Sequence, residues 1–401
     1  MITLLVIGML TQVSPTHPWV WVVPWVVVPI VLMWRMRDSA SLDAYAADPA
    51  PNAPRVSIVV PARNEARNIE ACVRSILASR YPDFEVIVMD DASQDGTGDI
   101  ARHIAAEDGR VRVVTTPELI NGWFGKQWAC HNGALEADGT LLLFTDADTR
   151  HGPELLARAV HALQARGADL LSVAGDQTME SFWERVLQLH VFAFIFGRYG
   201  GLEKVSRATN PLDKIGNGQY MLMRSEAYDR AGGHAAVRDH VAEDLRMAQE
   251  WCRLGLSVQI VLGMGYMSTR MYEGLGEIMR GWGKNIYAGG RDTINVGSVG
   301  QALLRVVYPV PTLWEIVPTV MVVLALSGVV GHAWLLWGAT VYGLTTLFWV
   351  AAYRWAKAPV WYALLHPVAS VVLFYVFAKA AWKGSEVEWK GRRYTSQSPR
   401  R

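Results

Sequence analysis

The chain has 401 residues, of which 51% are hydrophobic and 17 are tryptophan, and its formal net charge is +1. A chain with such apolar ends is not expected to be an ordinary soluble enzyme, and its near-neutral charge argues against nucleic acid as a partner. Its cysteines, Cys72, Cys130 and Cys252, are single and widely separated, so the sequence predicts neither a disulfide framework nor a cysteine metal site.

The first element in chain order is an uncharged run, Pro18 to Trp34, just long enough to cross a bilayer. Arg35 and Arg37 follow at once, and no Lys or Arg precedes the run. We therefore expect residues 1–37 to be an uncleaved membrane anchor rather than a signal peptide. The positive flank predicts that the next domain faces the cytoplasm, at the inner (cytoplasmic) membrane.

Residues 54–302 have globular composition and predict one large domain. Short β-branched apolar runs alternate there with helical patterns, which is typical of strand–helix–strand units in a parallel sheet. The predicted strands, quoted with the residues that end them, are RVSIVVPARNE, FEVIVMDDASQDG, VRVVTT, LLLFTDAD and DLLSVAG. The pattern indicates an open α/β sheet, which binds ligands beyond the carboxyl ends of its strands.

Three of these strands end in polar clusters, Ala62–Glu65, Asp90–Ser93 and the acid pair Asp146 and Asp148. In a parallel sheet all three lie at one edge, where a nucleotide would bind. The sequence has no glycine-rich phosphate loop, so the acid pair is expected to hold a divalent cation, Mg²⁺ or Mn²⁺. The alternative is that Asp148 or Thr149 only caps the next helix.

Four motifs, VSIVVPARNE, VIVMDDASQDGT, FTDAD and HVAEDLRMA, resemble family 2 glycosyltransferases with a GT-A fold in their order and separation. Three more, NGWFGKQWACHNGA, TRMYEGLGEIMRGWGKN and EVEWKGRRY, resemble bacterial glycosyltransferases that act on carotenoids and related polyisoprenoid lipids. The chain is also similar to hopanoid-associated and ceramide glucosyltransferases. The resemblance implies an α/β GT-A domain with a mainly parallel sheet, plus N- and C-terminal transmembrane helices.

The resemblance also implies a UDP-sugar donor, a divalent metal and a set of residues that bind them. Asp91 would hydrogen-bond the uracil, Asp146 would contact the nucleotide sugar, Asp148 would bind the metal, and Gln219 would lie in the floor of the site. The residues implied to line the base and ribose pocket are Pro61, Ala62, Asn64 and Glu65. The alternative is that Asp90–Gly96 is merely a solvated turn.

Two further residues have competing interpretations. Lys126 follows Gly125 at the start of a predicted helix, so its cation is expected at the donor diphosphate, although it could be an ordinary surface lysine. Asp244 matches the catalytic base of the family, although an acid in the first turn of a helix is also favoured by the helix dipole.

The segment EIMRGWGKN departs from the Q-x-x-R-W pattern of processive polysaccharide synthases, because Glu277 replaces the Gln and Gly281 separates Arg280 from Trp282. Trp282 is expected to face a lipid head group, and Arg280 and Lys284 to neutralise the departing diphosphate. The aromatic segment 181–202 is either a buried core helix or an interfacial helix that opens the site toward lipid.

Residues 303–382 predict further membrane helices, and residues 383–401 a basic tail. One N-terminal and three C-terminal spans would leave this tail outside, yet its charges favour the cytoplasm. Pro367, inside the last apolar run, predicts a broken helix that enters and returns. The resulting expectation is a cytoplasmic tail.

These observations predict a membrane-anchored inverting glycosyltransferase that moves one hexose, most readily glucose, from a UDP-sugar to a lipid. Asp244 would remove the proton of the attacking oxygen, which favours an isoprenoid hydroxyl over a carboxylate. The alternatives are a hopanoid or ceramide acceptor, a processive synthase, or a degenerate membrane scaffold without activity. The sequence does not decide the acceptor, the sugar or the oligomeric state.

Overall fold

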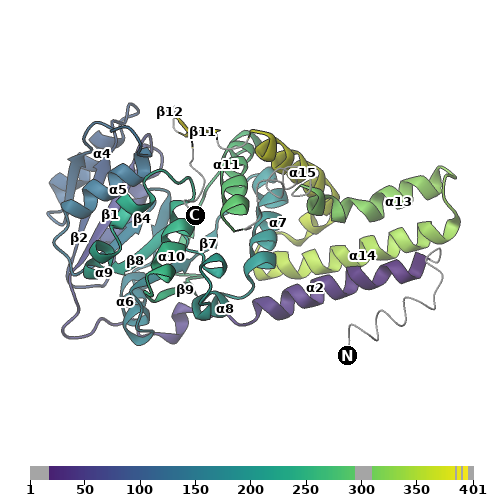
Figure 1. Cartoon of the computed structure of the whole chain (residues 1–401), viewed down its shortest axis with the longest axis horizontal. Coiled ribbons are helices and arrows are strands. Elements are labelled where there is room, and N and C mark those ends of the chain that lie inside the picture. Colours follow the sequence, from purple (N-terminus) through teal and green to yellow (C-terminus); the bar gives the residue numbers. More distant parts are fainter. Residues whose placement is uncertain (1–17, 294–308, 384–385, 390–391, 396–401) are drawn as a thin grey trace.

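The computed structural model describes residues 18–293, 309–383, 386–389 and 392–395. An α/β domain occupies one end of the molecule, and long helices from both ends of the chain project together from the other end (Figure 1). Some predictions fall on residues outside the described part of the chain. These are residues 1–17 of the anchor, 294–308 around the predicted end of the large domain, and 396–401 of the tail.

The centre of the domain is a seven-stranded sheet in the order β3-β2-β1-β4-β8-β6-β9. Its first four strands run parallel, as predicted, whereas β8 is antiparallel to both β4 and β6. The strands are β1 (Val56–Ala62), β2 (Phe84–Asp90), β3 (Val111–Thr115), β4 (Leu141–Thr145), β6 (Leu170–Ala174), β8 (Tyr220–Arg224) and β9 (Val258–Leu262).

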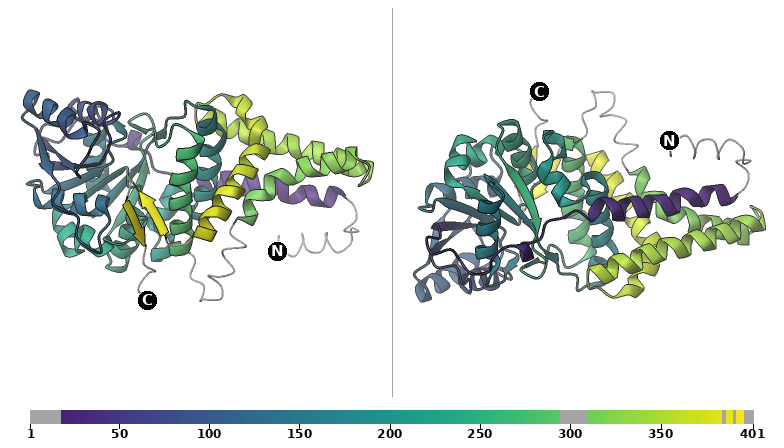
Figure 2. Two further views of the ribbon diagram at one scale, coloured as in Figure 1. Left: turned by 90° about the horizontal axis from the view of Figure 1, so that it is seen from above. Right: turned by 90° about the horizontal axis from the view of Figure 1, so that it is seen from below.

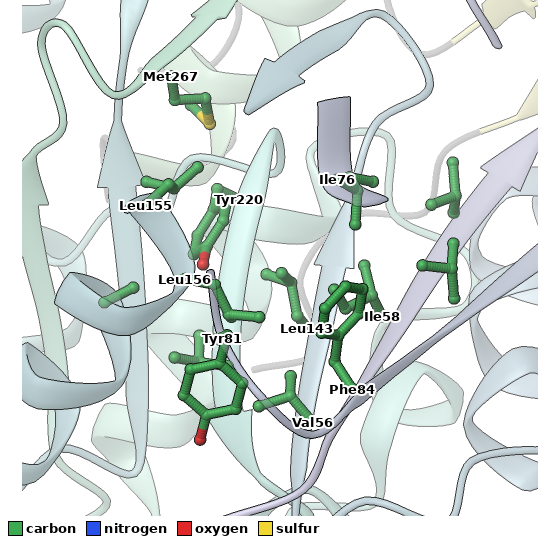
Figure 3. Close-up of a cluster of buried hydrophobic side chains, with 14 of the residues drawn as sticks. Val56, Ile58, Ile76, Tyr81, Phe84, Leu143, Leu155, Leu156, Tyr220 and Met267 are labelled. Carbon is green, nitrogen blue, oxygen red and sulfur yellow. The ribbon is translucent and has the colours of Figure 1, made fainter. Parts of the chain in front are cut away.

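Helices cover both faces of this sheet, because successive strand residues point to opposite sides and both sides are apolar. On one face the side chains of β1, β2 and β4 meet α3 (Ile69–Leu77), α4 (Thr97–Glu107) and α6 (Leu155–Ala165) in one core (Figure 3). On the other face they meet α5 (Gly125–Leu135), α9 (Ser225–Arg230) and α10 (Glu243–Arg253). The sheet is therefore fixed from both sides.

Smaller elements complete the domain. A three-stranded sheet consists of β5 (Thr149–His151), β10 (Met267–Thr269) and β7 (Asp176–Gln177). The short helices are η2 (Leu42–Ala44), α8 (Leu202–Arg207), η3 (Pro211–Asp213) and η4 (Gly233–Val237). Leu42 is fully buried in the core, so residues that precede the predicted start of the domain at 54 belong to it as well.

Three helices are long and apolar enough to cross a membrane: Pro18–Met36, His332–Trp355 and Val360–Trp382. The first comprises η1 (Pro18–Val22) and α2 (Val23–Met36), and the second is α14 (His332–Trp355). A shorter apolar segment, η5 (Val310–Ile316) with α13 (Val317–Leu326), runs beside them (Figure 2). Trp25 of α2 stacks on Trp314 and meets Trp337 of α14, which ties the N-terminal helix to the C-terminal ones.

The third candidate span differs from the others because protein covers 44% of it, against 6% of the N-terminal helix. It consists of η6 (Val360–Leu365) and α15 (His366–Lys383), which pack on α7 (Phe182–Tyr199) and α11 (Leu275–Thr293). The break falls just before Pro367, so the proline stands in the first turn of α15, where it is tolerated, and not inside a helix. The change from η6 to α15 thus falls beside Pro367, where the break was expected.

Helix α7 joins the α/β domain to the apolar helices. A capping box starts it, in which the Ser181 side chain accepts from the Glu184 N–H and the Glu184 side chain accepts from the Ser181 N–H. Val186 and Leu187 are fully buried, whereas the Phe182 and Phe194 side chains are exposed, so α7 has features of both predicted alternatives. After α15 the chain forms a hairpin of β11 (Glu386–Trp389) and β12 (Arg392–Thr395).

Candidate active site

The three polar strand ends meet at one edge of the sheet, as the parallel arrangement predicted. Pro61 and Ala62 end β1, Asp91 follows β2, and Asp146 and Asp148 follow β4. All five line one cavity of about 1270 Å³. The same cavity is lined by the other predicted site residues Glu65, Lys126, Gln219, Asp244, Arg280 and Trp282.

Asp146 is neutralised by a lysine. The Lys126 ammonium lies 2.7 Å from Asp146 Oδ1 and 2.8 Å from Glu243 Oε1, so it bridges the end of β4 to the start of α10. Burial opposes the charge on this lysine, but the two carboxylates raise the pKa of Lys126 well above its usual value. Lys126 is thus not an ordinary surface residue, and in this structure it holds two acids rather than standing ready for a diphosphate.

Asp148, unlike Asp146, forms no ion pair with a Lys or Arg side chain in the described part of the chain. Its Oδ1 atom is buried and makes no hydrogen bond. Burial, followed by the charges of Asp146 and Glu65, raises the pKa of Asp148 from 3.8 to about 7. The predicted alternative of a helix cap is wrong, because residue Thr149 enters strand β5 and α6 begins only at Leu155, where no side chain provides a cap.

An unpartnered buried carboxylate fits a metal site that substrate completes. Within the described ranges no group of three or more His, Cys, Asp or Glu side chains could hold an ion without help. Divalent cations of this size commonly take one or two carboxylates together with substrate phosphates and water. Asp148 suits the role of such a metal ligand. Asp146 needs no metal to balance its charge, because the Lys126 ammonium already does so.

Asp90 and Asp91 are only 8% and 4% exposed, whereas the turn that follows, Ala92–Gly96, is largely exposed, so the solvated-turn alternative holds for that turn but not for the two acids. Asp90 Oδ1 accepts the Ser93 N–H and so braces the turn, whereas Asp91 faces the cavity. Asn64 does not line the cavity as expected. Its backbone has a positive φ of 53° and its amide oxygen accepts the Gln94 N–H, so it joins the two loops instead.

Asp244 lies in the first turn of α10 and faces a glycine-rich loop. Its Oδ2 atom accepts the Gly218 N–H at 2.9 Å, and its Oδ1 atom accepts the Leu245 N–H at 2.8 Å. A Cβ atom at Gly218 would lie 3.2 Å from Asp244 Oδ2, and one at Gly216 would lie 3.0 Å from its carbonyl oxygen. The glycines therefore give the backbone close access to this acid.

The pKa of Asp244 is raised from 3.8 to about 6, by burial and then by the neighbouring Glu243 carboxylate. The nearby Lys126 and the two backbone N–H groups act in the opposite direction. A carboxylate with such a pKa is ionised at neutral pH and is a stronger base than an exposed aspartate.

The other end of the cavity is apolar and lies between α7, α11 and α15. Its walls come mainly from α7, α11 and α15, and include Phe192, Phe194, Ile195, Met279, Val376, Phe377 and Ala380. The Trp282 indole N–H donates to Gln188 Oε1 at 2.9 Å, and its ring packs between Phe192 and Tyr272. Trp282 is thus fixed on α7, while Arg280 lines the same cavity from the adjacent turn.

A search against family models matches residues 57–232 to "Glycosyl transferase family 2". This stretch resembles a family 2 glycosyltransferase domain. A 4,4'-diaponeurosporenoate glycosyltransferase of Staphylococcus haemolyticus is 29% identical over 59% of this chain and 62% of its own length. Its counterpart in Staphylococcus aureus strain MRSA252 is 27% identical over 85% of this chain and 88% of its own length.

Among solved structures, a mannosyltransferase from Pyrobaculum calidifontis in complex with GDP-Man and Mn²⁺ has a TM-score of 0.58. It is 20% identical and the match covers 92% of this chain and 98% of that one. This likeness shows a GT-A fold together with the helices outside the domain. The family-model match and these relatives support a transferase and do not support the alternative of an inactive scaffold.

Three residues in or beside this site were not predicted from the sequence. Arg63 lines the cavity and lies 3.8 Å from Asp91 Oδ2, and its place inside the first polar cluster was the one available signal. Glu243, in the first turn of α10, holds Lys126 by an ion pair. Arg392 reaches Asp91 from the tail, and no sequence pattern relates residues so far apart.

Proposed function

We propose that the protein transfers a hexose from a UDP-sugar to an isoprenoid lipid at the cytoplasmic face of the membrane. The observation that carries the proposal is the single cavity that joins Asp148 and Asp244 to apolar walls on α7 and α15. Its polar end suits a nucleotide sugar and its apolar end suits a hydrophobic acceptor. The carotenoid glycosyltransferases to which the chain is similar support an acceptor of this class.

The donor would occupy the polar end, with its base at Asp91 and its diphosphate near Asp148. The Pyrobaculum enzyme in complex with GDP-Man and Mn²⁺ supports a metal and a nucleotide sugar as a pair. Mg²⁺ or Mn²⁺ held by Asp148 would supply positive charge for the diphosphate. Arg280, which lines the cavity, adds a guanidinium on the same side of the reaction.

The reaction is an inverting displacement in which the acceptor oxygen attacks the anomeric carbon as the diphosphate leaves. Asp244 takes the proton from that oxygen, and its two backbone N–H bonds hold the carboxylate in place for this. The ion pairs of Lys126 hold the end of β4 close to the start of α10. Asp148, at the donor, and Asp244, at the acceptor, therefore keep a fixed relative position.

The acceptor oxygen is the point on which the relatives and the site differ. The relatives are named for diaponeurosporenoate, a carboxylate, which is already ionised and needs no base. A buried Asp244 with a raised pKa is the group that a hydroxyl acceptor requires. We therefore propose a hydroxyl acceptor and a glycosidic product, with a carboxylate acceptor as the second candidate.

The membrane arrangement follows from the helices. The segments α2, η5–α13 and α14 project together, whereas α15 turns back onto α7 (Figure 1). We propose three crossings, with α15 held at the catalytic side. This brings the tail to the same side as the catalytic domain, in agreement with its charge.

Labelling of cysteines in intact cells tests this arrangement. A cysteine at Ser327, at the exposed turn after α13, should react with an impermeant thiol reagent added outside, and one at Thr395 should not. The parent protein is the control, because Cys72 and Cys130 are buried and Cys252 lies on the catalytic domain. Labelling at Thr395 from outside would mean that α15 crosses the membrane.

Comparison of glycolipids tests the function itself. A host that carries the gene should contain a hexosylated lipid that disappears when Asp148→Ala replaces the parent gene, and mass spectrometry of the lipid extract identifies both parts. Asp99→Ala is the matched control, since the Asp99 side chain is 82% exposed and remote from the cavity. An unchanged lipid profile in the presence of the gene would contradict the proposal.

A further inference from the structure

The C-terminal hairpin places an arginine on Asp91, which lines the polar end of the cavity. Arg392 Nη1 lies 2.6 Å from Asp91 Oδ2 and its Nη2 lies 3.1 Å from Asp91 Oδ1, although 301 residues separate the two. Such a bidentate pair is among the stronger polar contacts in proteins. The two strands β11 and β12 pair with each other and, within the described residues, with no other strand.

The partner of this arginine is the acid expected to bind the nucleotide base. Asp91 is 4% exposed, and both of its oxygens are engaged by Arg392 while Arg63 approaches one of them from the loop after β1. A base that donates a hydrogen bond to Asp91 needs the same space in front of the same atoms. The guanidinium of Arg392 and the base of a donor therefore compete for one position.

We propose that Arg392 is a residue of the donor site that occupies the place of the nucleotide base until a donor binds. Donor binding then exchanges the Arg392–Asp91 ion pair for a base–Asp91 hydrogen bond and releases the hairpin from the cavity. The inference rests on the proposed nucleotide-sugar donor, and it adds to that proposal a part of the chain that lies outside residues 57–232, which match the family model.

The exchange has a measurable consequence for affinity. When only a fraction f of the protein has an open base position, the apparent dissociation constant equals the intrinsic one divided by f. If Arg392 holds Asp91 in about nine molecules of ten, its removal should tighten nucleotide binding about tenfold. A residue that merely supported the fold or contacted the bound donor would have no effect or the opposite one.

Calorimetric titration of the full-length protein with UDP in the presence of Mn²⁺ measures this. The Arg392→Gln variant should bind UDP about tenfold more tightly than the parent protein. Arg393→Gln is the matched control, because it removes the same charge from the next residue of the tail, and its affinity should equal that of the parent. Unchanged or weaker binding by Arg392→Gln would overturn the inference.

Proteolysis of the parent protein gives a second readout that needs no variant at the pair. Saturating UDP with Mn²⁺ should raise the rate at which trypsin cleaves after Arg392, and an unchanged or lower rate would count against the exchange. A parent protein that binds no UDP would overturn the proposed donor and the exchange together. UDP binding with unaltered affinity in Arg392→Gln would overturn the exchange alone.

Discussion

Asp244→Asn should lower the turnover number by about 10²-fold or more and leave UDP-sugar binding almost unchanged. The substitution keeps the size of the side chain and the position in the first turn of α10, but it removes the basic oxygen that faces Gly218. Single-turnover assays with the purified protein and calorimetry of donor binding measure the two effects separately.

A matched control separates catalysis from helix stability. Asp99 stands in the first turn of α4, with an exposed side chain, so Asp99→Asn reproduces the loss of an acid at a helix start without touching the cavity. Loss of the helix-dipole contribution costs about 0.3–1 kcal/mol of stability in either variant. Near-normal turnover in Asp244→Asn would mean that Asp244 only stabilises the start of the helix and is not the catalytic base.

The pH profile provides an independent check on the same residue. A base must be deprotonated to act, and the pKa of Asp244 is about 6, so kcat of the parent protein should rise through that pH and level off above it. In Asp244→Asn this rise should disappear. A product that is cleaved by mild alkali, as an ester is, would indicate a carboxylate acceptor instead of a hydroxyl.

Asp148→Asn should weaken metal-dependent UDP binding at least about tenfold, equivalent to about 1.4 kcal/mol. The reason is that Asp148 Oδ1 is buried and has no hydrogen-bond partner among the described residues, so the variant would remove the proposed metal ligand. Calorimetry with Mn²⁺ and with excess chelator measures the change. Equal affinity of the parent protein in both conditions would remove the metal from the proposal.

The same substitution should act on stability in the opposite direction. Burial and the adjacent acids disfavour the charged form of Asp148, so ionisation of this group destabilises the metal-free fold as pH rises from its unfolded pKa of 3.8 toward the folded value of about 7. Above that range metal-free Asp148→Asn should melt at a higher temperature than the parent, and Mn²⁺ should raise Tm of the parent only. A lower Tm in the variant would indicate a structural carboxylate.

The sequence was sufficient to predict the sheet and its functional edge, because both follow from local patterns. Apolar runs ending in Asp91 and Asp146 mark strands whatever their distance in the chain. The antiparallel direction of β8 was not predictable, since a buried strand has the same pattern in either direction. The turn of Thr149 into a strand likewise depends on β10, which is more than a hundred residues away.

The ion pairs of the site were harder to predict from the sequence than its position in the fold. The sequence predicted that Lys126 stands at the start of a helix. It could not show that Lys126 pairs with both Glu243 and Asp146, because the three residues come from α5, from α10 and from the loop after β4. The contact of Arg392 with Asp91 joins the first and last parts of the described chain. Ion pairs of this kind are set by the tertiary fold and leave no periodic signal.

Helix α15 contributes walls to the apolar end of the cavity, and the hairpin that follows it reaches Asp91 at the opposite end. Under the proposed function, a lipid that shifts α15 should also change how readily Arg392 releases Asp91. Linkage requires the converse to the same degree, so the factor by which a seated lipid changes nucleotide affinity must equal the factor by which a nucleotide changes lipid affinity. Lipid binding at α15 and nucleotide binding at Asp91 would thus be coupled through one continuous segment of the chain.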